Sequence, residues 1–223
     1  MSDAQEIRPA ATVVLLRERS AGMEVLLLRR NSKLVFYGGA WVFPGGRIDA
    51  ADHGGDGDDQ AARRAGVREL QEEAGLTLPP EALVHFAQWI TPPGRPRRFD
   101  TWYFAAVAPG GSVRVDDGEV DAHRWMRPAD ALDARAAGRI ELPPPTFVTL
   151  TTLREHERAG TALAALAATR PTHFEPRPLP IEGGTLYLYA GDAGYAERRP
   201  ETPGARHRMT AVEDGWHYVR EGS

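Results

Sequence analysis

Short runs of apolar residues, separated by polar or glycine-rich segments, predict a series of β-strands along this chain. The first two runs, Ala11–Leu16 and Met23–Arg29, are separated by six residues that are mostly polar. This spacing predicts a hairpin at the front of a sheet. Three later runs predict further strands over residues 82–90, 100–107 and 119–126.

Three segments between and after these strands are predicted to be helical. Residues 60–74 follow Asp58 and Asp59, which suit a helix N-terminus, and stop at Gly75, which suits a C-terminus. A second helix is predicted over residues 130–137, and apolar residues at helical spacing predict one amphipathic helix over residues 146–169. Strands that interleave with helices predict an α/β fold with α/β/α layers.

The chain is predicted to form one domain, residues 1–170, with a C-terminal extension, residues 171–223, packed on the same domain. The extension begins with a proline-rich stretch, followed by a strand pattern at 185–189 and a hairpin pattern over 208–212 and 216–219. Two roles for the extension stay open at this point, a cover over the active site and the interface of a homodimer.

Composition narrows the classes of function. The 223 residues carry a formal net charge of −4 and include no cysteine, which excludes disulfides, thiolate metal sites and cysteine nucleophiles. The negative charge argues against a nucleic-acid partner. No apolar run approaches the roughly 20 residues that cross a membrane. We therefore expect a cytoplasmic protein with no membrane partner.

The segment Arg68–Leu76 concentrates carboxylates on one face of the predicted helix. Glu69 lies three and four residues before Glu72 and Glu73, so the three side chains are within one helical turn. Arg68 can pair with Glu72 but cannot neutralise all three. Hard oxygen ligands at this density suit Mg²⁺ or Mn²⁺. The alternative is an acidic, solvated helix face without a ligand.

Residues 46–76 as a whole resemble the Nudix box. In that motif a glycine, five residues, a glutamate and seven residues precede Arg-Glu-aliphatic-x-Glu-Glu-x-Gly-aliphatic, and Arg68–Leu76 matches the second half at every specified position. The first half departs twice, because Asp52 replaces the glutamate and fifteen residues separate Asp52 from Arg68. We expect the eight additional residues, at about 53–60, to bulge out as a loop without disturbing the helix.

The resemblance implies a Nudix-type α/β/α sandwich with a mixed central sheet. It also implies metal-dependent hydrolysis of the diphosphate bond in a nucleoside diphosphate linked to another group. Carried over by position, Glu69, Glu72 and Glu73 are expected to ligate Mg²⁺ or Mn²⁺, together with a backbone carbonyl near Gly46. Arg68 is expected to orient the glutamates. The implied substrate is a small molecule of the nucleotide type.

Two further acids belong to this expected site. Asp52 is expected to be an outer or weaker metal partner. Glu119 stands six residues before Trp125, where the family often has another acid, and is expected to be a metal ligand or the general base. The alternative for Glu119 is an ordinary surface residue.

The insertion and the stretch Trp89–Phe104 resemble one branch of the family, the peroxisomal coenzyme A diphosphatases and their bacterial relatives. The resemblance therefore favours coenzyme A or an acyl-coenzyme A as substrate, with ADP-ribose next. Arg97 and Arg98 are expected to bind phosphate through their guanidinium groups, or else to pair with Asp100.

Two more residues are expected to contact substrate. Arg30 and Gly39 fit a coenzyme A signature of a different branch, from which Leu28, Asn31 and Val35 depart. Phe43 is among the aromatic residues expected either to stack on a base or to belong to the core. An alternative function is a Nudix-fold ligand sensor without turnover, which the departure at Asp52 and the insertion would support.

Overall fold

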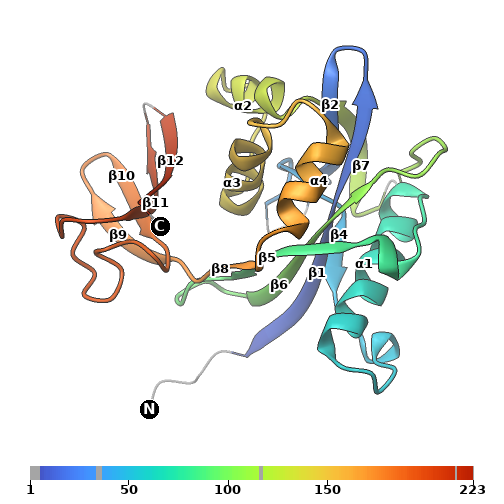
Figure 1. Cartoon of the computed structure of the whole chain (residues 1–223), viewed down its shortest axis with the longest axis horizontal. Helices are drawn as coiled ribbons and strands as arrows, with labels where there is room; N and C mark the ends of the chain where they lie inside the picture. The colour runs from blue at the N-terminus through green and yellow to red at the C-terminus, as the bar shows by residue number, and fades with distance from the viewer. Residues whose placement is uncertain (1–5, 34–36, 116–117, 214, 223) are drawn as a thin grey trace.

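The structure is a computed structural model that describes residues 6–33, 37–115, 118–213 and 215–222 (Figure 1). Residues 1–5 of the predicted domain and residue 223 of the predicted C-terminal extension lie outside the described residues. The strands are β1 Ile7–Arg19, β2 Gly22–Arg30, β3 Trp41–Val42, β4 Gly45–Arg47, β5 Val84–Ile90, β6 Arg98–Val107, β7 Val120–Met126, β8 Thr172–Phe174, β9 Arg177–Ile181, β10 Gly184–Leu188, β11 Arg206–Val212 and β12 Gly215–Glu221. The α-helices are α1 Asp58–Ala74, α2 Pro128–Ala136, α3 Pro144–Leu153 and α4 Ala159–Ala167, and short 3-10 turns cover Ala50–Asp52 and Pro80–Ala82.

The long strand β1 organises the central sheet. Within the described residues the sheet has eight strands in the order β3-β2-β1-β6-β5-β8, with β4 paired to β1 and β7 paired to β2. β1 runs antiparallel to β2, as the hairpin pattern predicted, and parallel to β6 from the pair Ile7 and Arg98 to the pair Leu16 and Val107. The sheet is therefore mixed, and the predicted strands are confirmed.

Alternation along β1 divides the core between the two faces of the sheet. Val13 and Leu15 face the cluster that includes Ala61, Ala65 and Leu70 of α1. Val14 and Leu16 face the other cluster, which includes residues of α2, α3 and α4. Figure 1 shows α1 on one side of the sheet and α2, α3 and α4 on the other. The predicted α/β/α fold is confirmed.

Helix α1 carries the acidic motif and is fixed at both ends. It begins at Asp58 after Gly57 and ends at Gly75, whose φ of 66° is the left-handed conformation that glycine adopts without strain. The Gly75 N–H closes the helix on the carbonyl of Gln71 at 3.0 Å. The inserted residues precede and begin this helix, and Arg64 holds the loop by donating to the carbonyl of Asp52 at 2.6 Å.

The single helix predicted over residues 146–169 is wrong, because two helices, α3 and α4, cover this segment. The chain between them is held by the β1–β2 hairpin. Met23 donates to the carbonyl of Glu157 at 2.9 Å, and the backbone N–H of Ala159 donates to the carboxylate of Glu18 at 2.8 Å. These bonds hold the intervening charged residues outside the helical hydrogen-bond pattern, which local periodicity cannot reveal.

The C-terminal residues form a short strand and a second sheet. β8 adds to the central sheet beside β5, and β9 to β12 form a four-stranded antiparallel sheet in the order β12-β11-β10-β9. Aromatic contacts join the two sheets, since Trp89 stacks on Phe174 with ring centroids 3.9 Å apart and meets Tyr189 edge-on at 5.7 Å. Trp216 contacts Phe147 of α3 at 5.4 Å between centroids.

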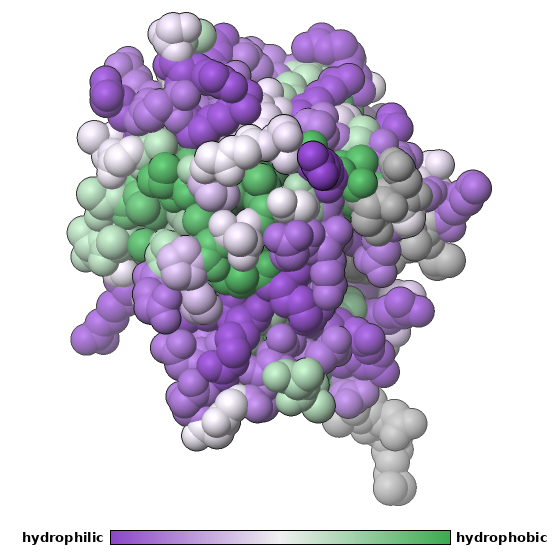
Figure 2. Space-filling model, turned by 90° about the vertical axis from the view of Figure 1, so that its right-hand side faces the viewer, coloured by the Kyte–Doolittle hydropathy of each residue, from purple (hydrophilic) through white to green (hydrophobic). Residues whose placement is uncertain are grey.

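The surface on the α1 side of the molecule is largely hydrophilic. Figure 2 shows one area on this side where hydrophobic residues gather, bordered by hydrophilic ones. None of the helices in the described residues is long and apolar enough to cross a membrane.

Candidate active site

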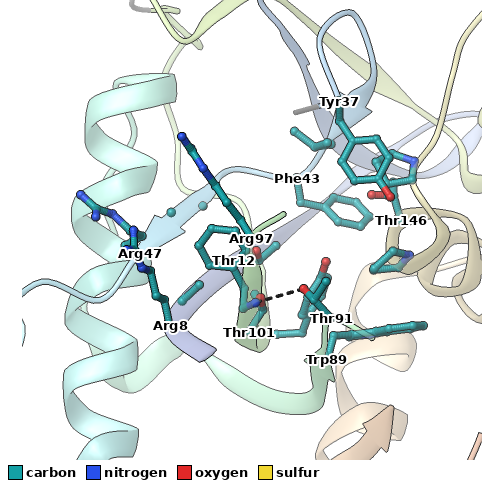
Figure 3. Close-up of a pocket in the computed structure, with 18 of the residues that line it drawn as sticks. Arg8, Thr12, Tyr37, Phe43, Arg47, Trp89, Thr91, Arg97, Thr101 and Thr146 are labelled. Atoms are coloured by element: carbon teal, nitrogen blue, oxygen red, sulfur yellow. Dashed lines mark hydrogen bonds between the residues drawn. The ribbon is translucent and has the colours of Figure 1, made fainter. Parts of the chain in front are cut away.

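A cavity of about 1040 Å³ lies where β1, β4, β6 and α1 meet, and its far wall comes from the C-terminal sheet. Three kinds of side chain line it. Glutamates and Arg68 come from α1, several arginines come from β1, β4 and the loop before β6, and aromatic residues and prolines lie opposite. Figure 3 shows Arg8, Arg47 and Arg97 on the side of the cavity nearest α1, with Tyr37, Thr146 and Trp89 on the other side.

Arg68 is the centre of a network of carboxylates. Its Nη1 donates to Oε1 of Glu69 at 2.8 Å and to Oε2 of Glu72 at 3.1 Å. Its other nitrogens reach both carboxylate oxygens of Asp52, at 3.2 and 3.0 Å, and the carbonyl of Arg47 at 2.9 Å. The hydrogen bond with Asp52 is the main reason that the pKa of Arg68 is raised. The guanidinium therefore contacts both Glu69 and Glu72, the side chains that Arg68 is expected to orient.

Asp52 lies behind Arg68 and is not among the residues that line the cavity. Its side chain is buried, and burial alone would raise its pKa, but the bonds from Arg68 and from the backbone N–H of Asp49 lower it. Asp52, which was expected to be an outer metal partner, therefore holds Arg68 in place in the structure.

Glu69 and Glu73 lie deeper than Glu72. Burial raises the pKa of Glu69, and burial together with the charge of Glu69 raises the pKa of Glu73 to about 8, although the N–H of Gly45 donates to Glu73 at 2.9 Å and opposes this. Gly46 has to be a glycine here, because a Cβ at this position would be 2.4 Å from the carboxyl carbon of Glu69. The backbone of β4 is therefore pressed against the two carboxylates.

Glu119 lies at the same end of the cavity. It precedes β7, lines the cavity, and its negative charge raises the pKa of both Glu69 and Glu73. Asn31 donates its backbone N–H to the carbonyl of Glu119 at 2.8 Å, which ties this residue to the end of β2. The structure therefore brings the predicted additional acid to the glutamates of α1.

The chemistry of these donors fits a divalent cation, although they do not converge. Within the described ranges, no three Asp, Glu or His side chains lie close enough together to hold a metal ion, and Arg68 occupies one oxygen each of Glu69 and Glu72. Hard carboxylate oxygens whose pKa values are raised by burial and mutual repulsion are nevertheless groups that a divalent cation would stabilise in the ionised form. Glu69, Glu73 and Glu119, with the backbone at Gly46, are the donors around this point.

The predicted substrate contacts divide into two sets. Arg30, Phe43 and Arg97 all line the cavity. Arg98 does not, and its Nε donates to the carbonyl of Thr91 at 2.9 Å, so it fixes the loop before β6. Asp100, the other partner considered for these arginines, accepts from Gln88 at 2.7 Å.

Sequence reasoning missed several residues that line the cavity. Arg8 and Arg47 come from strands whose pairing with one another is not evident in the sequence, and Tyr187 comes from the second sheet. Arg8 and Thr12 lie on the same face of β1, and extending the predicted first strand back to Arg8 would have shown that this face carries polar side chains at its beginning.

Comparison with known proteins places these features in a family. A family model described as NUDIX domain matches residues 6–144, more than half of the chain. The chain is 28% identical to a putative nudix hydrolase 7 of Caenorhabditis elegans over 66% of this chain and 61% of that protein. It is 23% identical to the acyl-coenzyme A diphosphatase NUDT19 of Xenopus laevis over 93% of this chain and 80% of that protein.

Solved structures give the same result for the fold. A crystal structure of a NUDIX hydrolase from Alicyclobacillus acidocaldarius matches with a TM-score of 0.66 and 26% identity. The match covers 75% of this chain and all of that protein.

Proposed function

Because the chain belongs to the NUDIX family, as its box predicted, we propose that it hydrolyses the diphosphate bond of a nucleoside diphosphate linked to another group. Coenzyme A or an acyl-coenzyme A is the favoured substrate, and ADP-ribose is next. The names of the relatives support this choice, because two of the matched proteins, from Xenopus laevis and Homo sapiens, are acyl-coenzyme A diphosphatases. The observation that carries the proposal is the cavity, which joins the box glutamates to a row of arginines.

In the proposed reaction, Mg²⁺ or Mn²⁺ would be held by Glu69, Glu72, Glu73 and the backbone carbonyl near Gly46, with Glu119 beside them. The bound cation supplies neutralisation of the diphosphate and a more acidic water. Glu119 takes the proton from the attacking water, since it faces the glutamates from the opposite element. Arg68 keeps Glu69 and Glu72 in position. Such transfer depends on positioning and charge stabilisation, so no covalent nucleophile is needed.

The two sides of the cavity differ in chemistry and suit different parts of such a substrate. Arginines bind phosphate through charge-assisted hydrogen bonds, which favours the α1 side for the nucleotide phosphates. The side with Phe43, Tyr37 and Tyr187 is aromatic and suits the base or the remainder of the other group. The C-terminal extension thereby acts as one wall of the site on the domain formed by residues 1–170.

The test is hydrolysis of a panel of compounds by the purified full chain. Coenzyme A, acetyl-coenzyme A, ADP-ribose, NADH and a diadenosine polyphosphate are offered with Mg²⁺ or Mn²⁺. Glu72→Gln is expected to lose most of the activity, about 100-fold or more, because removing a transition-state charge stabiliser has effects of this order. Its thermal stability without metal is expected to change little, because Glu72 is mostly exposed.

Glu81→Gln is the matched control, since Glu81 is exposed and outside the cavity, and it is expected to behave as the wild type. Equal rates for Glu72→Gln and the wild type would contradict the metal assignment. Tight binding of one compound without turnover by the wild type would replace the hydrolase with the alternative considered above, a ligand sensor.

A further inference from the structure

Three arginines gather at one end of the cavity, beyond the glutamates. Arg8, Ala10 and Thr12 alternate on β1, and all three line the cavity, as do Phe99 and Thr101 on the neighbouring strand β6. Alternation along a strand therefore places the side chain of Arg8 on the open face of the sheet. Arg97 immediately precedes β6, whose first residue pairs with Ile7 of β1. Arg47 is the last residue of β4 and pairs with Ala10 of β1.

The side chains of these three arginines form few bonds within the protein. Among the described residues, Arg47 and Arg97 have no hydrogen-bond or ion-pair partner from their side chains. Arg8 has one, an exposed pair with Glu6 at 3.3 Å, which is the kind of pair that contributes little to stability. Arg68, in contrast, is saturated by Asp52 and the glutamates.

The position of the cluster relative to the glutamates decides which phosphate it can reach. Gly45, which donates to Glu73, is paired with Thr12. Arg8 is four residues further along β1, which corresponds to about 13 Å along an extended strand. Arg8 therefore lies further along the strand than the glutamates, beside the part of a bound substrate that extends beyond its diphosphate.

The cavity continues past this cluster. A second hollow of about 310 Å³ adjoins the first and shares Arg8, Arg47 and Asp49 with it. Glu6 and Asp49 are the acids that face this hollow. Asp49 lies 3.8 Å from Arg68, so part of its charge is already balanced. The cluster thus has room for an anionic group on its open side.

We infer that Arg8, Arg47 and Arg97 form a subsite for a phosphate monoester on the ribose of the substrate, separate from the diphosphate that is cleaved. The inference rests on the proposed function and makes it more specific. Guanidinium groups are suited to a dianionic phosphate because their paired N–H groups match its oxygens. The subsite would make the protein prefer nucleotides with a phosphorylated ribose over those without, and coenzyme A carries such a group whereas ADP-ribose and NADH do not.

Two substrates that differ only in this phosphate provide the test, namely coenzyme A and dephospho-coenzyme A. The wild type is expected to favour coenzyme A in kcat/KM by about tenfold or more, the size of one or two charge-assisted hydrogen bonds. In the double variant Arg8→Ala/Arg47→Ala this ratio is expected to fall close to one. Arg170→Ala, which removes an exposed arginine outside the cavity, is the matched control and should keep the wild-type ratio. Thermal denaturation verifies that each variant is folded.

A wild-type ratio near one would overturn the inference. So would a double variant that loses activity on both substrates by the same factor, because the arginines would then bind the diphosphate itself. If neither compound is hydrolysed, the proposed substrate class is wrong, and calorimetric binding still tests the subsite. Adenosine 3′,5′-bisphosphate should bind the wild type about tenfold more tightly than adenosine 5′-monophosphate, with the difference lost in the double variant, and equal binding would overturn the subsite.

Discussion

Asp192 anchors the second sheet, and replacing it by asparagine tests how that sheet is held. Its carboxylate is completely buried and forms a two-point ion pair with Arg208, with both oxygen–nitrogen distances at 2.7 Å. It also accepts the backbone N–H groups of Gly194 and His207, each at 2.9 Å. The substitution Asp192→Asn would keep the shape of the side chain but remove the charge that these four donors face.

The expected magnitude follows from the pKa of Asp192. Burial alone would raise that pKa, but the bonds from Arg208, His207 and Gly194 outweigh it and lower the pKa from 3.8 to about 2. At 1.36 kcal/mol per pKa unit, this difference corresponds to folding free energy on the order of 2 kcal/mol. Because the folded-state pKa is the lower one, this stabilisation is present above pH 4 and is lost as the pH falls from 4 towards 2.

The assay is urea unfolding of the wild type and of Asp192→Asn at several pH values between 7 and 3. The variant is expected to be less stable by about 2 kcal/mol at pH 7, and the difference should shrink at the acidic end. Asp130→Asn is the matched control, because Asp130 forms the same two-point pair with Arg127 at 2.8 and 2.7 Å, but both side chains are about half exposed. The control should lose less than about 1 kcal/mol. A difference for Asp192→Asn that did not change with pH would refute the linkage argument.

Two further substitutions test close packing and buried polarity. Gly46→Ala should lower hydrolysis by about 100-fold with the fold retained, since the new Cβ displaces the carboxylate of Glu69, whereas Gly110→Ala, with open space around it, should have no effect on activity. Tyr189→Phe should raise the free energy of unfolding by up to about 1 kcal/mol in chemical denaturation, because the buried Tyr189 hydroxyl lacks a partner among the described residues. Tyr103→Phe, which removes a hydroxyl that is hydrogen-bonded, should lower it, and the same sign for both tyrosines would contradict the assignment.

The layers of the fold were predictable because the pattern of β1 is unambiguous. Apolar residues occupy both faces from Val13 to Leu16, which is typical of a strand covered on both sides, and the order of strands and helices then leaves few arrangements. The box was equally informative, because the helical positions of Glu69, Glu72 and Glu73 fix their common face. The placement of Glu119 beside them needed the family resemblance, since a residue ahead of a distant strand has no local signal.

What the sequence did not reveal depends on contacts between distant segments. The break between α3 and α4 arises from bonds to the β1–β2 hairpin, and β8 becomes a strand only because β5 offers a free edge. Arg8 and Arg47 became candidates for the same reason, because the β1–β4 pairing that brings them together is separated by a loop in the chain. The homodimer, the cytoplasmic location and the absence of nucleic-acid partners stay predictions.

The departures from the family pattern at Asp52 and in the insertion are compatible with a working site, since both lie behind Arg68 and away from the cavity. Asp52 has one methylene less than glutamate, yet both of its oxygens reach Arg68, because the turn at Ala50–Asp52 brings its backbone to the helix and Arg64 holds the carbonyl of Asp52. The inserted residues pass outside this contact, with Asp56 paired to Arg64 at 2.6 Å. Asp52 therefore still holds Arg68 in place, and Arg68 still contacts Glu69 and Glu72, although the loop is longer than in the family pattern. The alternative of a ligand sensor loses its main structural support, because the features that suggested it leave the glutamates in position.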